Sequence, residues 1–138
     1  MGTEKSREEA RRWFQTAESD LETARVLHRN QRYAHACFHA QQAGEKAVKS
    51  VWYLHAGDPW GHSVQKLIGD LEAFDAAPFD ELRDLLPEGS KLDKYYIPTR
   101  YPNGLPDLVP DAAYLEDDAR TAIGLSERLI ERIRPLLA

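Results

Sequence analysis

The sequence predicts an all-α fold, an antiparallel bundle of about five helices in a single domain spanning residues 1–138. Apolar residues recur at spacings of three and four along several long segments, which is the period of an amphipathic helix. No stretch shows the sustained alternation of apolar and polar residues that marks a strand. The chain is 42% apolar and 30% charged, a balance that supports one globular core, so we expect order nearly throughout.

The first two helices differ in the character of their apolar stripes. The first is predicted from about Ser6 to Arg29, and Ser6 and Glu9 have the spacing of a capping box. A break at Asn30-Gln31 precedes the second helix, which should end near Gly57. Small residues dominate the seam of this second helix, which comprises Tyr33, Cys37, Ala40, Gly44, Ala47, Val51 and Leu54. Because small residues let neighbouring helices approach closely, this helix is expected at the centre of the bundle.

The middle of the chain predicts one regular helix and one broken helix. Ser63 has the position of an N-cap for the third helix, whose buried side carries Val64, Leu67, Ile68 and Leu71. Residues 75–79 are expected to form a loop. Two short helical pieces follow, residues 79–86 and about 88–96, because Pro87 and Gly89 interrupt the pattern between them.

The last part of the chain predicts a proline-rich strap followed by a long helix. Residues 97–110 include Pro98, Pro102, Gly104, Pro106 and Pro110, too many breakers for regular structure. Loops of this length in compact domains are usually functional or disordered. The last helix should open at Asp111 and bury a stripe of Leu115, Ala119, Ala122, Ser126, Leu129, Ile133 and Leu136.

Composition narrows the range of functions. The net charge of −5 argues against a protein that coats nucleic acid, so an RNA contact would come from a few basic residues at one site. His35 and His39 lie four residues apart but have no third ligand at a telling spacing, so neither a metal nor another cofactor is expected. Cys37, the single cysteine, lies among alanines and should be a buried, inert thiol. Without a signal peptide or an apolar run that could span a membrane, we expect a cytoplasmic location and no membrane partner.

Two groups of residues could contact phosphates. On the second helix, a band about 80° wide holds His35, His39, Gln42, Lys46, Lys49 and Tyr53, and it is either a phosphate-binding face or an ordinary solvated one. Residues 91–103 hold three tyrosines, three cations and an asparagine. In one interpretation Arg100 binds phosphate while tyrosines stack on bases. In the other, the aromatic residues pin the strap to the bundle and a buried Asp or Glu neutralises Arg100.

Four stretches of this sequence resemble the HEPN family: Ala17–Leu21, Cys37–Lys49, Gly61–Ser63 and Leu92–Pro102. The resemblance implies a helical bundle, usually dimeric and often encoded beside a minimal nucleotidyltransferase. Many HEPN proteins are metal-independent RNases or toxins whose active site is an Arg followed a few residues later by a His. Arg100 matches that arginine, but residues 105–107 are Leu, Pro and Asp, and no histidine follows His62. Because such an RNase needs the imidazole as a general acid or base, the resemblance leaves that activity open.

These observations lead to one main hypothesis and two alternatives. We expect a homodimer that is the binding partner of a nucleotidyltransferase protein in a toxin–antitoxin-like two-gene module. Its site for a nucleotide, RNA or a small polar substrate would comprise Arg100, Tyr101, Lys94, Tyr95, Asn103, Lys46 and Lys49. In the first alternative the chain is a metal-independent endoribonuclease that combines Arg100 with His39 or His62. In the second it is a structural dimerisation module without a ligand.

Overall fold

The computed structural model describes residues 3–138, and it confirms an all-helical fold. The long helices are α1 (Glu4–Arg29), α2 (Tyr33–Leu54) and α7 (Glu116–Ile133). The shorter ones are α3 (Val64–Phe74), α4 (Ala76–Leu82), α5 (Leu86–Asp93) and the single turn α6 (Pro110–Ala113), with 3-10 turns at Arg83–Leu85, Pro102–Gly104 and Arg134–Leu137. Residues 3–138 contain no strand, and none of their helices is long and apolar enough to cross a membrane.

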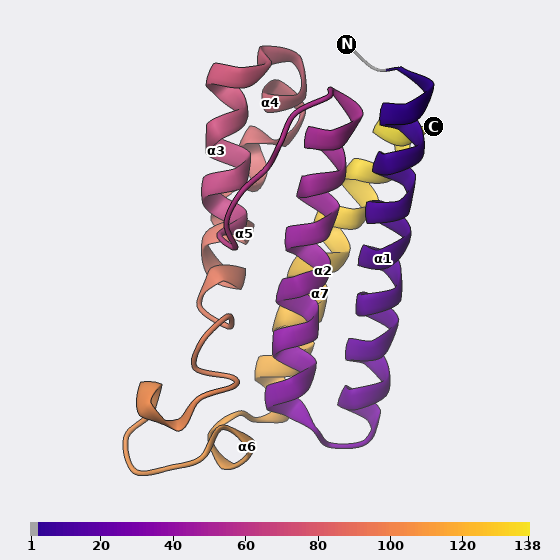
Figure 1. The fold of residues 1–138 in the computed structure, drawn as a ribbon. Coiled ribbons are helices and arrows are strands. Elements are labelled where there is room, and N and C mark those ends of the chain that lie inside the picture. The colour runs from indigo at the N-terminus through magenta and orange to yellow at the C-terminus, as the bar shows by residue number, and fades with distance from the viewer. Residues whose placement is uncertain (1–2) are drawn as a thin grey trace.

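Helix α2 lies at the centre of the bundle (Figure 1). Helix α1 runs beside it, α7 packs behind it, and α3 and α5 lie along its other side. Gly44 shows why small residues occupy this helix: a Cβ there would lie 2.8 Å from Leu92 of α5 and 3.2 Å from Leu129 of α7. The predicted central helix is therefore confirmed. The connection from α2 descends along the bundle to the start of α3, close to the end of α5 (Figure 1).

The start of α1 differs from the predicted capping box. Thr3 is the N-cap, and its hydroxyl accepts a hydrogen bond of 3.0 Å from the backbone N–H of Ser6. The helix therefore begins at Glu4, and the prediction that Ser6 and Glu9 cap each other is wrong. Glu9 instead accepts hydrogen bonds from the side chains of Arg12 and Trp13, one turn further along the helix.

The broken helix in the middle of the chain is displaced from its predicted bounds. Residues 76–79 are helical rather than a loop, because Asp75 caps α4 and its carboxylate accepts from the backbone N–H of Ala77. Pro87 does not interrupt a helix either. It occupies the first turn of α5, where a backbone N–H would have no partner within the helix. Helix α5 then ends at Asp93, earlier than predicted, and the chain turns sharply before the strap.

The last helix starts later than Asp111. A single turn, α6, is followed by an extended segment at Tyr114 and Leu115, and α7 opens at Glu116. Leu115 is the N-cap of α7, and the Asp118 carboxylate accepts a hydrogen bond of 2.8 Å from its backbone N–H. Leu115 is consequently 65% exposed rather than part of the buried stripe. The acidic residues of the first turn favour a helix start here because they oppose the positive end of the helix dipole.

Gly89 makes the close packing of α5 against the start of α3 possible, and its substitution gives a test of this fold. A Cβ at position 89 would lie 2.9 Å from the backbone nitrogen of Gln65, which cannot rotate away as a side chain would. Gly89→Ala should therefore destabilise the protein by about 1–3 kcal/mol in chemical denaturation. Gly124→Ala is the matched control, because outside the local backbone of its own helix nothing lies within 4 Å of a Cβ there, and it should be neutral or stabilising. Equal effects of the two changes would contradict the packing described.

Candidate functional site

The turn after α5 holds Arg100 in a fixed position. The backbone N–H groups of Arg100 and Tyr101 both donate to the carbonyl of Ile97, at 3.0 and 3.2 Å. Thr99, which lies between Ile97 and Arg100, is buried, and its hydroxyl donates to the carbonyl of Tyr95. Pro98 further limits the backbone by fixing one dihedral angle. The turn therefore presents the Arg100 side chain from a constrained backbone.

Aromatic rings surround the guanidinium of Arg100. Its central carbon lies 4.5 Å from the ring centres of Phe38 and Tyr96 and 5.0 Å from that of Tyr101. Its Nε–H donates to the carbonyl of Tyr96 at 2.8 Å. Contacts of a cation with aromatic faces contribute about 0.5–2 kcal/mol each, depending on how well water is excluded. This platform holds the guanidinium in place without neutralising it.

Arg100 differs from the other cations that are at least partly buried in residues 3–138. Those others are Arg25, Lys46, Lys49 and Arg132, and each forms an ion pair with a carboxylate. No carboxylate of residues 3–138 lies within 4.0 Å of the Arg100 guanidinium. The interpretation in which a buried Asp or Glu neutralises Arg100 is therefore wrong for the described part of the chain.

His62 contacts the same aromatic platform from the connection between α2 and α3. Its imidazole stacks on the ring of Tyr96, with ring centres 4.7 Å apart and planes inclined by 18°. The side chain is 56% exposed. Its Nδ1 lies 3.3 Å from each carboxylate oxygen of Glu45. Arg100 and His62, which lie far apart in the sequence, thus meet at one tyrosine.

A buried polar network on α2 lies beneath His62. The Glu45 carboxylate, 4% exposed, accepts hydrogen bonds from Lys49 Nζ at 2.9 Å and from the Gln42 amide at 3.3 Å. The amide of Gln41, fully buried, lies 3.4 Å from the same carboxylate and donates at 2.9 Å to the backbone carbonyl of His62. Buried charges require such partners because an unpaired ion in the interior is strongly destabilising. The network fixes both the backbone and the ring of His62.

Asp93 joins the His62 segment to the end of α5. Its carboxylate accepts hydrogen bonds of 2.6 Å from the Ser63 hydroxyl and the Val64 N–H, and one of 3.2 Å from the Gln65 N–H. These donors form the start of α3, where a negative charge is also favoured by the helix dipole. Since Tyr96 follows three residues after Asp93, this contact sets the position of His62 relative to the aromatic platform.

The side chains of the polar band predicted on α2 differ in their exposure to solvent and in whether they are already paired with another residue. Lys46 pairs with Asp20 of α1 at 2.6 Å, and Lys49 is buried against Glu45. His39 is half-buried, and its Nδ1 has no hydrogen-bond partner among residues 3–138. Burial lowers the pKa of the His39 imidazole, which favours its neutral form. Of the predicted band, His35 is the exposed member.

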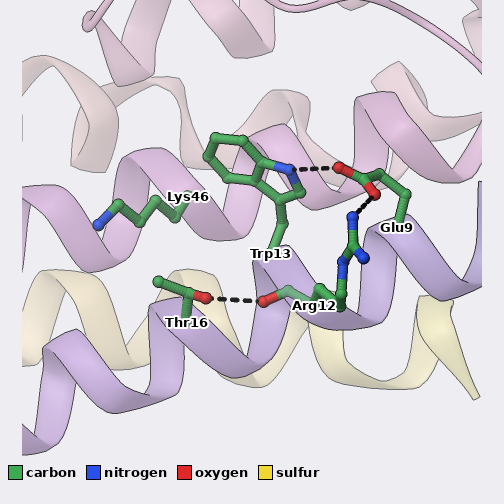
Figure 2. Close-up of a pocket in the computed structure, with 5 residues that line it drawn as sticks. All are labelled: Glu9, Arg12, Trp13, Thr16 and Lys46. Carbon is green, nitrogen blue, oxygen red and sulfur yellow. Dashed lines mark hydrogen bonds and ion pairs between the residues drawn. The ribbon is translucent and has the colours of Figure 1, made fainter.

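A pocket of about 390 Å³ lies beside this band, between α1 and α2 (Figure 2). Its lining residues are Glu9, Arg12, Trp13, Thr16 and Lys46. Trp13 donates to Glu9 at 3.1 Å and stacks on Tyr53 with ring centres 5.1 Å apart. Both cations of the pocket are already paired, Arg12 with Glu9 and Lys46 with Asp20. An anion would have to displace one of these carboxylates, so the pocket is less suited to phosphate than Arg100 is.

The other predicted site residues occupy different environments. Tyr101 contacts the guanidinium of Arg100 and is 50% exposed, and Lys94 and Asn103 are exposed on the same stretch of chain. Tyr95 is half-buried and faces Tyr114, with ring centres 6.3 Å apart. Burial raises the pKa of Tyr95 to about 12. Tyr95 is thus a packing residue, and it is not among the rings that contact Arg100.

Sequence reasoning missed Phe38, Tyr96 and Glu45 as members of the site. A usable signal existed for Glu45, because Gln41, Glu45 and Lys49 are spaced four apart and share one face of the helix. No comparable signal joined Phe38 to Arg100, since that contact depends on the path of the turn after α5.

Potential metal ligands and the single thiol have the following positions in the described chain. Within residues 3–138 no group of three or more His, Cys, Asp or Glu side chains is placed to hold a metal ion. Cys37 is fully buried, as predicted, and burial raises the pKa of its thiol to about 12. The thiolate, which is the reactive form, is therefore strongly disfavoured.

The described chain is thus a helical bundle in which two side chains contact the ring of Tyr96. One is Arg100, which has no carboxylate partner among residues 3–138, and the other is His62, which contacts the carboxylate of Glu45. The HEPN domain family matches residues 10–136 of the chain. The chain belongs to this family, as the resemblance of its sequence motifs suggested.

Individual relatives agree with this assignment. The chain is 29% identical over 134 residues to the Methanocaldococcus jannaschii protein named "Putative toxin MJ1304", a match covering 93% of this chain and 88% of that protein. The crystal structure of TT1696 from Thermus thermophilus is similar with a TM-score of 0.83 and 35% identity, covering 91% of this chain and 96% of the other. That of ST0689, described as an archaeal HEPN homologue, is similar with a TM-score of 0.76 and 31% identity, covering 94% and 98%.

The contacts of Asp93 predict that this residue maintains the site as well as the fold. Asp93→Asn removes the charge that three donors share, and we expect a loss of about 1–3 kcal/mol in the free energy of unfolding. The ring proton signals of His62 in NMR spectra should also shift, because its stacking on Tyr96 depends on this contact. Asp70→Asn is the control, since Asp70 is exposed and pairs with Lys66 alone; it should change stability by less than about 0.5 kcal/mol. Unchanged stability and His62 signals in Asp93→Asn would contradict the role described.

Proposed function

We propose that the chain binds nucleotide or RNA phosphates at Arg100, as the HEPN component of a two-gene module whose other product is a nucleotidyltransferase protein. One observation carries the proposal. Arg100 is the single partly buried cation of residues 3–138 without a carboxylate partner, and three aromatic rings hold it.

The geometry of Arg100 suits a phosphate. A guanidinium has five N–H donors, and the Nε–H is bonded to the carbonyl of Tyr96. The other N–H groups have no acceptor among residues 3–138. Their fork matches two oxygens of one phosphate, and such charge-assisted pairs are about twice as strong as neutral hydrogen bonds. A phosphate would supply both the missing charge and the missing acceptors.

The surroundings of Arg100 favour a nucleotide over an isolated phosphate. Tyr101 is half exposed beside the guanidinium and offers a face on which a base can stack. Lys94 and Asn103 are exposed on the flanking chain and can contact a neighbouring phosphate or sugar. The net charge of −5 limits binding to this local site, so affinity should depend on a few contacts.

The proposal of a two-gene module is supported by the relatives of the chain, and the proposal of a dimer is supported by its exposed apolar side chains. The M. jannaschii relative is named "Putative toxin MJ1304". The resemblance to the HEPN family implies a gene that is often found beside one for a minimal nucleotidyltransferase. Exposed apolar side chains gather on the strap and its flanks: Ile97, Leu108, Val109 and Leu115, each more than half exposed. Such a surface is typical of an interface, and we propose that a second copy of the chain covers it.

Arg100→Ala tests the binding site directly. The change should weaken binding of a fluorescent single-stranded RNA by about ten- to a hundredfold, because one charge-assisted contact is worth about 1.5–3 kcal/mol. The helical signal and melting temperature should stay close to those of the wild type. Arg83→Ala is the matched control: Arg83 also lies over an aromatic ring, that of Phe79, but near a carboxylate, Asp80. Unfolding of Arg100→Ala without a selective loss of binding would instead make Arg100 an architectural residue.

Light scattering tests the homodimer. A dimer should give twice the monomer mass of 15.7 kDa at micromolar concentration, and its interface should bury more than about 1,000 Å². Val109→Asp places a charge in the proposed interface and should shift the population toward the monomer. A mass of 15.7 kDa across the micromolar range would contradict the proposal.

A further inference from the structure

The indole of Trp13 forms part of the wall of the pocket between α1 and α2 (Figure 2). Its N–H donates to Glu9 at 3.1 Å, and its ring stacks on Tyr53 with planes inclined by 22°. The ammonium of Lys49 lies 5.8 Å from the centre of the same ring. Tyr53 and Lys49 belong to α2 and lie outside the set of residues that line the pocket. The indole is therefore held mainly by contacts outside the pocket, and it presents a partly exposed ring to the pocket.

The charges around this pocket balance one another. Arg12 pairs with Glu9, and Lys46 pairs with Asp20 at 2.6 Å, so both cations of the lining are already neutralised. An ion that entered the pocket would lose hydrating water without gaining a free counter-charge, which is unfavourable. The pocket therefore favours an uncharged group, in contrast to Arg100, whose guanidinium has no carboxylate partner among residues 3–138.

The lining of the pocket keeps both a hydrogen-bond donor and an acceptor. A lysine ammonium has three N–H donors. That of Lys46 donates to Asp20, and its other N–H groups have no acceptor among residues 3–138. The hydroxyl of Thr16 donates to the carbonyl of Arg12 at 2.8 Å, so its oxygen can still accept a hydrogen bond. A flat ring that carries both carbonyl and N–H groups would use both, whereas a hydrocarbon ring would use neither.

We propose that this pocket binds a nucleobase, which stacks on the indole of Trp13 and forms hydrogen bonds with Lys46 and Thr16. Its volume of about 390 Å³ lies within the range of small-ligand pockets, roughly 300–1,000 Å³. Aromatic side chains hold the bases of single strands by stacking, with little dependence on sequence, because every base has a π-face. Base binding at Trp13 deepens the proposed function, on which it rests for the class of ligand, and it needs no contact with Arg100.

Two sources can supply the base: a free nucleoside, or an RNA strand whose phosphate lies at Arg100. Phe38, which contacts Arg100, and Lys46, which lines the pocket, both belong to α2 and are eight residues apart. This separation is about 12 Å along the helix axis. A strand of a few nucleotides is long enough to cover it, so the length of the RNA distinguishes the two sources.

Uridine tests base binding alone, because it carries no phosphate. The indole N–H signals of the three tryptophans would be followed by NMR, with that of Trp13 assigned from Trp13→Phe. Uridine should shift the Trp13 signal to saturation, in Arg100→Ala as in the wild type. Trp60 is the internal control, because it is 82% exposed and would be the first to contact a ring that stacks on any accessible indole. An unshifted Trp13 signal, or an equal shift of Trp60, would overturn the proposal.

Trp13→Leu measures how much stacking contributes, because it keeps an apolar side chain and removes the ring. It should weaken uridine binding by about five- to a hundredfold, and Trp60→Leu, the matched control, should not. An RNA of about six nucleotides that also binds more weakly to Trp13→Leu would supply the base from the strand, and unchanged binding of that RNA would point to a free nucleoside. A folded Trp13→Leu that binds uridine like the wild type would overturn the proposal. If this variant does not fold, the wild-type titration decides.

The possible outcomes separate base binding at Trp13 from the proposed function at Arg100. RNA binding that depends on Arg100, in a protein whose Trp13 signal does not respond to uridine, would overturn the inference and leave the proposed function standing. RNA binding that is lost in Trp13→Leu and kept in Arg100→Ala would support the inference and overturn the proposed site at Arg100. Absence of both uridine and RNA binding would overturn both.

Discussion

The rest of the site depends on one buried interaction, the contact of the Glu45 carboxylate with Lys49 in the middle of α2. A lone carboxylate at this depth would be strongly destabilising. The charge of the lysine and the hydrogen bonds of the two neighbouring glutamine amides offset that cost. The carboxylate held there also contacts the connection that carries His62, since both of its oxygens lie 3.3 Å from the imidazole Nδ1. The central helix thereby positions a histidine that is not part of it.

The hydrogen bonds of Asp93 are the second constraint, because they place His62 beside the turn that carries Arg100. Asp93 binds the start of α3 and lies three residues before Tyr96, so it connects the end of α5 to the His62 segment. The turn that follows brings Arg100 back over Tyr96 and Phe38. Gly44 and Gly89 allow these elements to approach, since a side chain at either position would collide with a neighbour. Packing and site geometry are therefore two consequences of the same close contacts.

Much of the fold could be predicted from the sequence, because helix periodicity is a local property. The small-residue seam from Cys37 to Val51 identified the central helix, and Ser63 was correctly predicted as the N-cap of the third. The errors lie at helix ends, where Thr3, Asp75 and the Asp118–Leu115 contact decide the boundary. The hypothesis that Arg100 binds phosphate came from its position among tyrosines and prolines and from the family resemblance. Its lack of a carboxylate and its proximity to His62 could not be predicted, since both depend on how distant segments pack.

The central claim is that Arg100 and His62 belong to one binding site, and NMR titration tests it most directly. Uridine 3′-monophosphate would be added to labelled protein while the Arg100 Nε–H and the His62 ring signals are followed. Because both groups contact Tyr96, the account predicts that their signals shift together with one dissociation constant, and that the His62 signals no longer shift in Arg100→Ala. Shifts confined to the pocket around Trp13 and Lys46, or different dissociation constants for the two groups, would contradict it.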